Sequence, residues 1–213
     1  MVPVLETGAT VSEARLAAVM IHGRGRTPEE MANLGEALAI DGVRYYCPEA
    51  PAGSWYPRRF LEPLEDNQPD LGRALSAIDA LIDRVGMVGF PVERLVICGF
   101  SQGACLAVQT LMLRPAPYAA GVFFTGGLIG PPGTTWRSPK RIPGVPVLLT
   151  GSENDDWVPA WRVRETAAVL SGFGAMVDTV IYEDRAHVVS DDEIRRASHM
   201  LRSCLERLGP IDR

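Results

Sequence analysis

Residues 94–108 read RLVICGFSQGACLAV, and this stretch decides between two interpretations of the fold. A run of β-forming residues reaches Cys98, helix-forming residues follow Ser101, and the serine stands between Gly99 and Gly103. The pattern is either an ordinary turn between a strand and a helix, or a turn that holds out a serine hydroxyl as a nucleophile. A serine between two glycines is a weak signal by itself. The strand before it and the helix after it favour the nucleophile.

Runs of β-forming residues alternate with helical periodicity along the whole chain. Several of the β runs are apolar without alternation, which is typical of parallel strands buried on both faces. Strands are predicted at 17–21, 43–47, 94–98, 121–125, 145–150 and 177–182, and helices at 28–40, 71–85, 101–114, 160–172 and 194–208. Residues 3–7 are expected to add an antiparallel edge strand. The sequence therefore predicts an α/β fold in a single domain, residues 1–213: a mainly parallel, doubly wound sheet with helices on both faces.

Composition excludes several classes of function. The chain is 46% hydrophobic and 22% charged, as in ordinary globular proteins. Its net charge of −5 and the lack of a basic stripe argue against a nucleic-acid partner. We expect no membrane span, because no apolar run reaches about 18 residues. The first residues do not resemble a signal peptide, and the four cysteines lack paired metal-binding spacing. We therefore expect a cytoplasmic protein with buried free thiols and no metal.

Residues with hydrolytic chemistry follow three of the expected strands. Ser101 follows the third strand, an acidic group of Glu153, Asp155 and Asp156 follows the fifth, and His187 follows the sixth. Ligands bind at the carboxyl ends of the strands in an open α/β sheet. The chain order of serine, acid and histidine is the order found in nucleophile-elbow hydrolases. A serine hydroxyl needs a base within hydrogen-bond reach, so the sequence predicts that these side chains meet.

Backbone N–H groups at the same edge are candidates for stabilising an oxyanion. The helix that begins at Ser101 directs the Gln102 N–H to the site, and the turn at 22–25 supplies a second donor, which we assign to Arg24.

Taken alone, His187 would be interpreted as a surface loop histidine. Residue spacing does not choose among the three acidic candidates, which would otherwise form a solvated loop or cap a helix.

Four motifs together resemble a known family. They are HGRG at 22–25, GFSQGA at 99–104, DDWVP at 155–159, and His187 after the last strand. This combination resembles the phospholipase/carboxylesterase family of α/β-hydrolases, to which acyl-protein thioesterases belong. The resemblance extends over about residues 17–207. It implies a single-domain α/β-hydrolase fold without a separate lid domain.

The resemblance also implies a role for each matching residue. Ser101 would be the nucleophile and His187 the base. Asp155 would be the acid, because the family's acid stands three residues before the valine of its Val-Pro pair. The oxyanion N–H groups would come from Arg24 and Gln102.

Two features resemble bacterial carboxylesterases more than eukaryotic thioesterases. The stretch SWYPRRF occupies 54–60, and Arg26 stands after HGRG where the eukaryotic branch carries an acid. Both favour a small ester over an acylated protein. Trp55, Tyr56 and Leu128 are expected to line the substrate pocket, the alternative being that they pin loops to the core. Four arginines are interpreted as ordinary surface charges, with attraction of an anionic substrate as the alternative: Arg24, Arg26, Arg58 and Arg59.

The sequence therefore predicts a serine hydrolase that cleaves carboxylic esters of small or medium-chain acids through an acyl-enzyme. We expect a small-molecule ester as its substrate and no cofactor. The oligomeric state stays open between a monomer and a homodimer. The alternatives are an acyl thioesterase, a lysophospholipase, a dienelactone-type hydrolase, and a non-catalytic binding module on the same fold.

Overall fold

The computed structural model describes residues 2–142 and 144–209. Residues 1, 143 and 210–213 of the expected domain lie outside this description. One seven-stranded sheet has the order β1-β3-β2-β4-β5-β6-β7, and β1 pairs antiparallel with β3 whereas the other neighbours are parallel. The expected edge strand is thus confirmed. The strands are β1 (Val4–Gly8), β2 (Leu16–Ile21), β3 (Val43–Pro48), β4 (Leu95–Phe100), β5 (Ala120–Phe124), β6 (Pro146–Ser152) and β7 (Met176–Tyr182).

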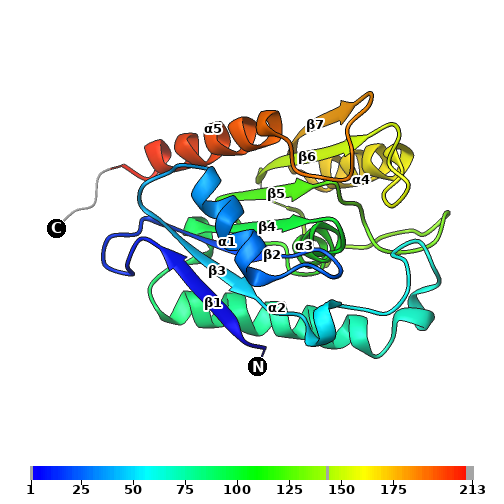
Figure 1. The fold of residues 1–213 in the computed structure, drawn as a ribbon, viewed down its shortest axis with the longest axis horizontal. Coiled ribbons are helices and arrows are strands. Elements are labelled where there is room, and N and C mark those ends of the chain that lie inside the picture. Colours follow the sequence, from blue (N-terminus) through cyan, green and yellow to red (C-terminus); the bar gives the residue numbers. More distant parts are fainter. Residues whose placement is uncertain (1, 143, 210–213) are drawn as a thin grey trace.

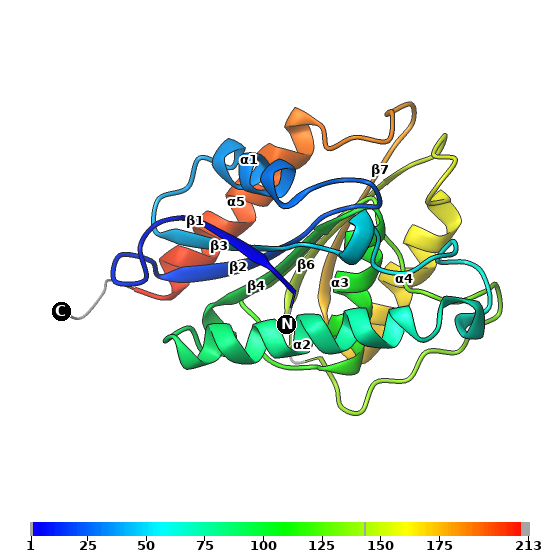
Figure 2. The ribbon, with the colours of Figure 1, turned by 60° about the horizontal axis from the view of Figure 1, so that its bottom comes forward.

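Helices cover both faces of the sheet (Figure 1). α1 and α5 lie on one face, and α2, α3 and α4 lie on the other (Figure 2). The α-helices are α1 (Pro28–Ala37), α2 (Asp70–Met87), α3 (Gln102–Leu113), α4 (Ala160–Phe173) and α5 (Asp191–Arg207). Three short 3₁₀-helices are η1 (Pro51–Gly53), η2 (Leu64–Asn67) and η3 (Val92–Arg94). This confirms the predicted doubly wound α/β architecture, with no separate lid domain in the described part of the chain.

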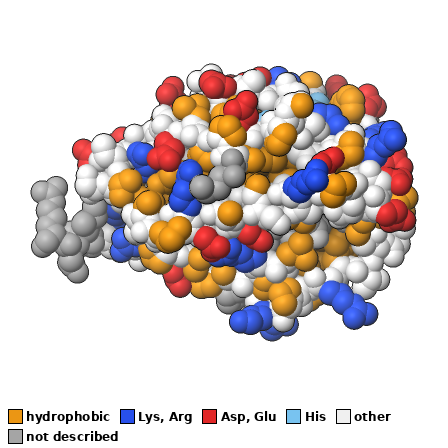
Figure 3. Space-filling view, turned by 90° about the horizontal axis from the view of Figure 1, so that it is seen from below, with side chains coloured by type: hydrophobic (Ala, Val, Ile, Leu, Met, Phe, Trp, Pro, Cys, Tyr) orange, Lys and Arg blue, Asp and Glu red, His pale blue; other side chains and the backbone are white. Residues whose placement is uncertain are grey.

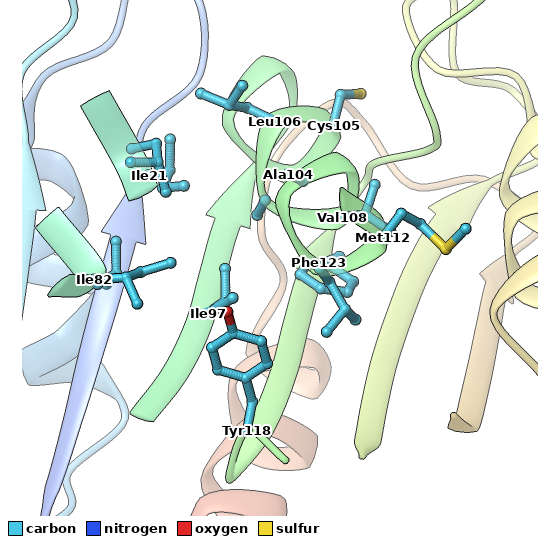
Figure 4. Close-up of a cluster of buried hydrophobic side chains, with 14 of the residues drawn as sticks. Ile21, Ile82, Ile97, Ala104, Cys105, Leu106, Val108, Met112, Tyr118 and Phe123 are labelled. Atoms are coloured by element: carbon cyan, nitrogen blue, oxygen red, sulfur yellow. The ribbon is translucent and has the colours of Figure 1, made fainter. Parts of the chain in front are cut away.

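Each face of the sheet has its own apolar core. On the face of α3, side chains such as Ile82, Ile97 and Phe123 pack together in the cluster of Figure 4. On the opposite face, Met31 of α1 and Leu201 of α5 belong to a second cluster. The central strands are buried on both sides, which explains why their sequences are apolar without alternation. Burial of apolar surface contributes about 25 cal/mol for each Å² removed from water, so these two layers make the main favourable contribution to folding.

The strand register brings the residues after β2, β4, β5, β6 and β7 to one edge of the sheet. Ile21 pairs with Gly99. Phe100 pairs with Phe124 at the ends of β4 and β5, and Ser152 pairs with the last residue of β7. The parallel strands end toward the right in Figure 1, where the long loops that follow β3 and β5 also lie. Candidate functional residues far apart in the sequence therefore share this edge.

The surface on the side of α2 carries mixed charges. Figure 3 shows acidic and basic side chains scattered among apolar ones over this face. Across residues 2–142 and 144–209, no helix is both long and apolar enough to cross a membrane. The four cysteines are buried and free, as the sequence predicts.

Candidate active site

Ser101 lies in the sharp turn between β4 and α3. Its backbone has φ 55° and ψ −120°, a left-handed conformation that strains a residue with a side chain. Two hydrogen bonds hold the turn: the Ser101 N–H donates to the Phe124 carbonyl at 3.0 Å, and the Cys105 N–H donates to the Ser101 carbonyl at 3.0 Å. The strained turn leaves the serine side chain partly exposed at the edge of the sheet.

Gly99 and Gly103 lie where no side chain fits. A Cβ atom on Gly103 would lie 2.1 Å from the Ile21 carbonyl oxygen, and one on Gly99 would lie 2.4 Å from the Gly103 carbonyl oxygen. Both obstacles are backbone atoms, so no rotamer change relieves the overlap. Gly23 is also close, since its Cβ would lie 3.2 Å from the Ser101 Cβ. The glycines thus let β2, the HGRG turn and α3 close around the serine.

A chain of hydrogen bonds joins side chains from three strand ends. The Ser101 Oγ lies 2.7 Å from the His187 Nε2. The His187 Nδ1 lies 2.8 Å from the Asp155 Oδ2. Since an ionised carboxylate only accepts hydrogen bonds, His187 donates from Nδ1 and accepts the serine O–H at Nε2. This arrangement allows the imidazole to take a proton from Ser101.

Asp155 is the acidic residue that the structure places beside His187. Its second oxygen accepts two backbone N–H groups of the following turn, at 2.9 and 2.8 Å. Glu153 instead forms an exposed ion pair with Arg164. Asp156 is exposed, and its side chain forms no hydrogen bond or ion pair with the described residues. The loop conformation therefore separates three acids that the sequence places within four residues of one another.

The surroundings of Asp155 favour its ionised form. Burial by itself raises the pKa of this carboxyl. The hydrogen bond from His187 and those from the backbone of Val158 and Trp157 outweigh burial, so the pKa lies below its usual value. Asp155 is consequently ionised at neutral pH and can hold the imidazole in one orientation.

Two backbone N–H groups next to Ser101 have no acceptor among the described residues: those of Arg24 and Gln102. Gln102 is the first residue of α3, and a helix leaves its first N–H groups unpaired. Arg24 follows Gly23 in the turn that packs against the serine. Both N–H groups can therefore donate to the oxyanion that would develop on a carbonyl attacked by Ser101.

Comparisons with known proteins identify the family of this chain. Residues 5–205 match the family model described as Phospholipase/Carboxylesterase. The chain belongs to the phospholipase/carboxylesterase family. This confirms the resemblance inferred from its four motifs.

Several family members are similar over most of the chain. A crystal structure of a phospholipase/carboxylesterase from Dyadobacter fermentans is 34% identical, with a TM-score of 0.90, and the match covers 94% of this chain and 97% of that one. The curated relative named Probable carboxylesterase Os04g0669500, from Oryza sativa subsp. japonica, is 24% identical over 87% of this chain and 76% of the relative. A second rice relative, named Probable inactive carboxylesterase Os04g0669700, is 23% identical over 67% of this chain and 58% of the relative.

In this phospholipase/carboxylesterase family member, His22 supports the HGRG turn from within. Its Nδ1 lies 2.8 Å from the Gly23 carbonyl oxygen, and its Nε2 lies 3.0 Å from the Ala50 nitrogen. A neutral imidazole satisfies both contacts, donating from Nδ1 and accepting at Nε2. Burial lowers the pKa of His22, although the bond to Gly23 and nearby carboxylates oppose the shift. The ring therefore positions the turn in its uncharged form.

A cavity of about 240 Å³ opens beside Ser101. Tyr56 borders this cavity, and it is also 2% exposed and part of the apolar core. Trp55 and Leu128, which were expected to line the substrate pocket, do not border this cavity, and both lie in the apolar core. The Trp55 indole donates to the His22 carbonyl at 2.8 Å, and Leu128 is 0% exposed. The cavity is lined by Gly23, Arg24, Arg26, Tyr56, Arg58, Arg59, Phe60, Phe100, Ser101, Gln102, Cys105, Trp157, Val158 and His187.

Sequence reasoning missed a buried polar network beneath the His187 loop. The Arg185 Nη2 donates to the Thr125 Oγ1 at 2.6 Å, and the Thr150 hydroxyl donates to Glu193 at 2.5 Å. Glu193 also forms a capping box with Ser190 at the start of α5. The serine-to-glutamate spacing signals such a cap. The contact with β6 has no sequence signal, because it depends on how α5 packs.

Proposed function

We propose that this chain is a serine hydrolase, one α/β-hydrolase domain that cleaves carboxylic esters of small or medium-chain acids through an acyl-enzyme intermediate. The observation that carries the proposal is the hydrogen-bond chain from Asp155 through His187 to Ser101, at 2.8 and 2.7 Å. Family membership supports ester hydrolysis as the reaction class. The strained serine turn supports a nucleophile, since such strain persists where function requires it.

The first half of the reaction forms the acyl-enzyme. Ser101 Oγ attacks the ester carbonyl carbon while its proton passes to the His187 Nε2. Asp155 stabilises the imidazolium that forms. The backbone N–H groups of Arg24 and Gln102 bind the oxyanion of the tetrahedral intermediate. When the intermediate collapses, the bond to the alcohol breaks and His187 gives its proton to the leaving alkoxide.

The second half regenerates the serine. Water enters, His187 removes its proton, and the resulting hydroxide attacks the acyl carbon. The carboxylic acid leaves, and Ser101 recovers its proton from the imidazolium. Besides the substrate, the two halves use side chains and backbone N–H groups of this protein and one water molecule. The cavity volume of about 240 Å³ is small beside the roughly 300–1,000 Å³ of drug-sized ligand pockets, which favours short acyl groups.

Fluorophosphonate labelling of wild type and Ser101→Ala tests the proposal, together with turnover of p-nitrophenyl esters from two to twelve carbons. We expect labelling on the peptide that contains Ser101, turnover that falls as the acyl chain lengthens, and loss of both in the variant. The neighbouring Cys105 is the matched control, since Cys105→Ala should still be labelled. Absence of labelling and turnover in folded wild type would favour the binding-module alternative.

Thioester hydrolysis is the nearest alternative activity, since the same site attacks both substrates. A matched pair of esters and thioesters with one acyl group separates the two. We expect the ester to have the higher kcat/KM relative to its uncatalysed hydrolysis. A higher relative value for the thioester would reassign the activity while retaining the serine mechanism.

A further inference from the structure

The cavity beside Ser101 is lined by four arginines and, among the described residues, by no aspartate or glutamate. From the sequence, these arginines are interpreted as ordinary surface charges, with attraction of an anionic substrate as the alternative. The fold brings Arg24 and Arg26 from one loop next to Arg58 and Arg59 from another. The rest of the lining is largely apolar and aromatic. A concave site of this kind uses its few polar groups to orient a ligand.

Arg24 is held rigidly without being neutralised. Its guanidinium donates to the carbonyl oxygens of Tyr56 at 2.8 Å, Pro57 at 2.9 Å and Arg58 at 2.6 Å. Carbonyl oxygens are uncharged acceptors, so the positive charge of Arg24 is undiminished. These bonds also fix the loop that carries the next two arginines.

Asn67 holds the same loop from the inside. It is 0% exposed, and its side chain accepts the Arg58 N–H at 2.8 Å and donates to the Arg59 carbonyl at 3.1 Å. The Arg59 guanidinium donates to the carbonyl oxygen of Asp156 at 2.7 Å, on the loop that follows β6. The backbone that carries both arginines is therefore fixed before any ligand binds, which reduces the entropy lost on binding.

The charges of three of the four arginines have no counter-ion in residues 2–142 and 144–209. Arg26 lies 3.5 Å from Glu30 in an exposed pair. Arg24, Arg58 and Arg59 have no described carboxylate within 4.0 Å of their side-chain nitrogens. The Arg58 side chain also has no hydrogen-bond partner within the described residues. In a chain of net charge −5, this concentration of uncompensated positive charge at one cavity favours an anionic ligand.

We propose that the substrate is an ester with a free carboxylate, bound by Arg58 with the support of Arg59 and Arg24. This inference rests on the proposed esterase function and specifies its substrate class. A guanidinium presents paired N–H donors that match a carboxylate. Arg58 is the residue with its donors unoccupied, so it contacts the carboxylate. Arg24 and Arg59 contribute mainly positive potential, because their donors are engaged by backbone carbonyls.

Two matched substrate pairs test the proposal on either side of the ester bond. Ethyl hydrogen glutarate is compared with ethyl pentanoate, and 4-acetoxybutanoate with butyl acetate, by titrating the acid released. In at least one pair, we expect the anionic ester to have about tenfold higher kcat/KM, chiefly through a lower KM, as one charge-assisted hydrogen bond in a partly solvated site would give. The preference should decrease as salt concentration rises.

Arg58→Gln should reduce that preference about tenfold. Arg73→Gln is the matched control, because Arg73 is a 75% exposed arginine on α2 outside the cavity and its loss changes net charge equally. An equal reduction in both variants would overturn the proposal in favour of a general charge effect. Neutral esters cleaved as well as their anionic partners in both pairs would also overturn it while leaving esterase function intact. If wild type is labelled by the fluorophosphonate but cleaves none of the four esters, the proposal is also overturned. If wild type is not labelled, the proposed esterase function itself fails.

Discussion

Arg185 and Glu193 form a buried ion pair beneath the loop that carries His187, with the Arg185 Nε 3.4 Å from the Glu193 Oε2. Their side chains are 7% and 0% exposed. Arg185 also donates to the carbonyl oxygens of Ala186 and Val188, which flank the histidine. The pair thus connects the His187 loop to the beginning of α5 and to the ends of β5 and β6.

Arg185→Met should destabilise the protein by about 3 kcal/mol, because it leaves Glu193 buried without its cation. Esterase activity should fall mainly in kcat, since the loop that holds His187 loses its support. Urea denaturation measures the loss of stability, and ester kinetics measure the loss of kcat.

In a double-mutant cycle that combines Arg185→Met with Glu193→Gln, we expect a coupling energy of at least about 1 kcal/mol. Arg195→Met is the control: its exposed pair with Asp192 should contribute little to stability, because solvent screens exposed ion pairs. Additive effects of the two buried substitutions would contradict a direct interaction.

Asp155→Asn should lower kcat by about 10³–10⁴-fold, the range known when the acid of a serine triad is replaced by its amide. The neutral amide would no longer accept the His187 N–H as the carboxylate does, so the imidazole would lose its orientation. Asp156→Asn, one residue away and exposed, should change kcat by less than about twofold. The measurement is p-nitrophenyl ester turnover by folded variants. Equal losses in the two variants would show that the acid is assigned wrongly.

Gly103→Ala should destabilise the protein by about 3 kcal/mol, the upper part of the usual range for overpacking. The new Cβ would meet the Ile21 carbonyl oxygen at 2.1 Å, and the backbone of β2 would have to shift. Gly86→Ala is the matched control within α2, where nothing lies within 4 Å of the new atom. That change should be neutral or stabilise by up to about 1 kcal/mol. Urea denaturation decides the point, and equal stability of the two variants would contradict the close packing of the turn.

Acidification should destabilise the protein through His22. Burial lowers the pKa of this residue in the folded state, so the unfolded chain binds the proton more readily, at a pKa of about 6.5. The free energy of unfolding should therefore decrease as pH falls from about 7.5 to 5.5. His22→Gln should remove part of this dependence, and the exposed His199→Gln should retain it. Urea denaturation at several pH values measures the slopes, and an unchanged slope in His22→Gln would contradict a neutral buried imidazole.

Much of the fold follows from local sequence patterns. The strands were predictable because apolar runs without alternation indicate parallel strands buried on both faces. The stripe from Leu71 to Val85 predicted α2, because its spacing places apolar side chains on one helix face. The serine turn was also predictable from local sequence, because the two positions that require glycine, Gly99 and Gly103, lie within two residues of Ser101.

The site depended more on the family resemblance and on packing. Residue spacing left Glu153, Asp155 and Asp156 equivalent, and the conformation of their loop brings Asp155 to His187. Trp55 and Leu128 were expected in the pocket, but burial of their apolar surface draws them into the core.

The sequence by itself determined the order of strands and helices, the serine turn, and the residue types available for hydrolysis. These properties depend on backbone preferences and hydrophobic periodicity, which act over a few neighbouring residues. Only the tertiary structure decided that Glu193 would lie under the His187 loop and that Arg58 would face the cavity of Ser101. The first contact depends on how the beginning of α5 packs against the sheet, and the second joins loops tens of residues apart, so packing of the helices and long loops on the sheet sets both distances.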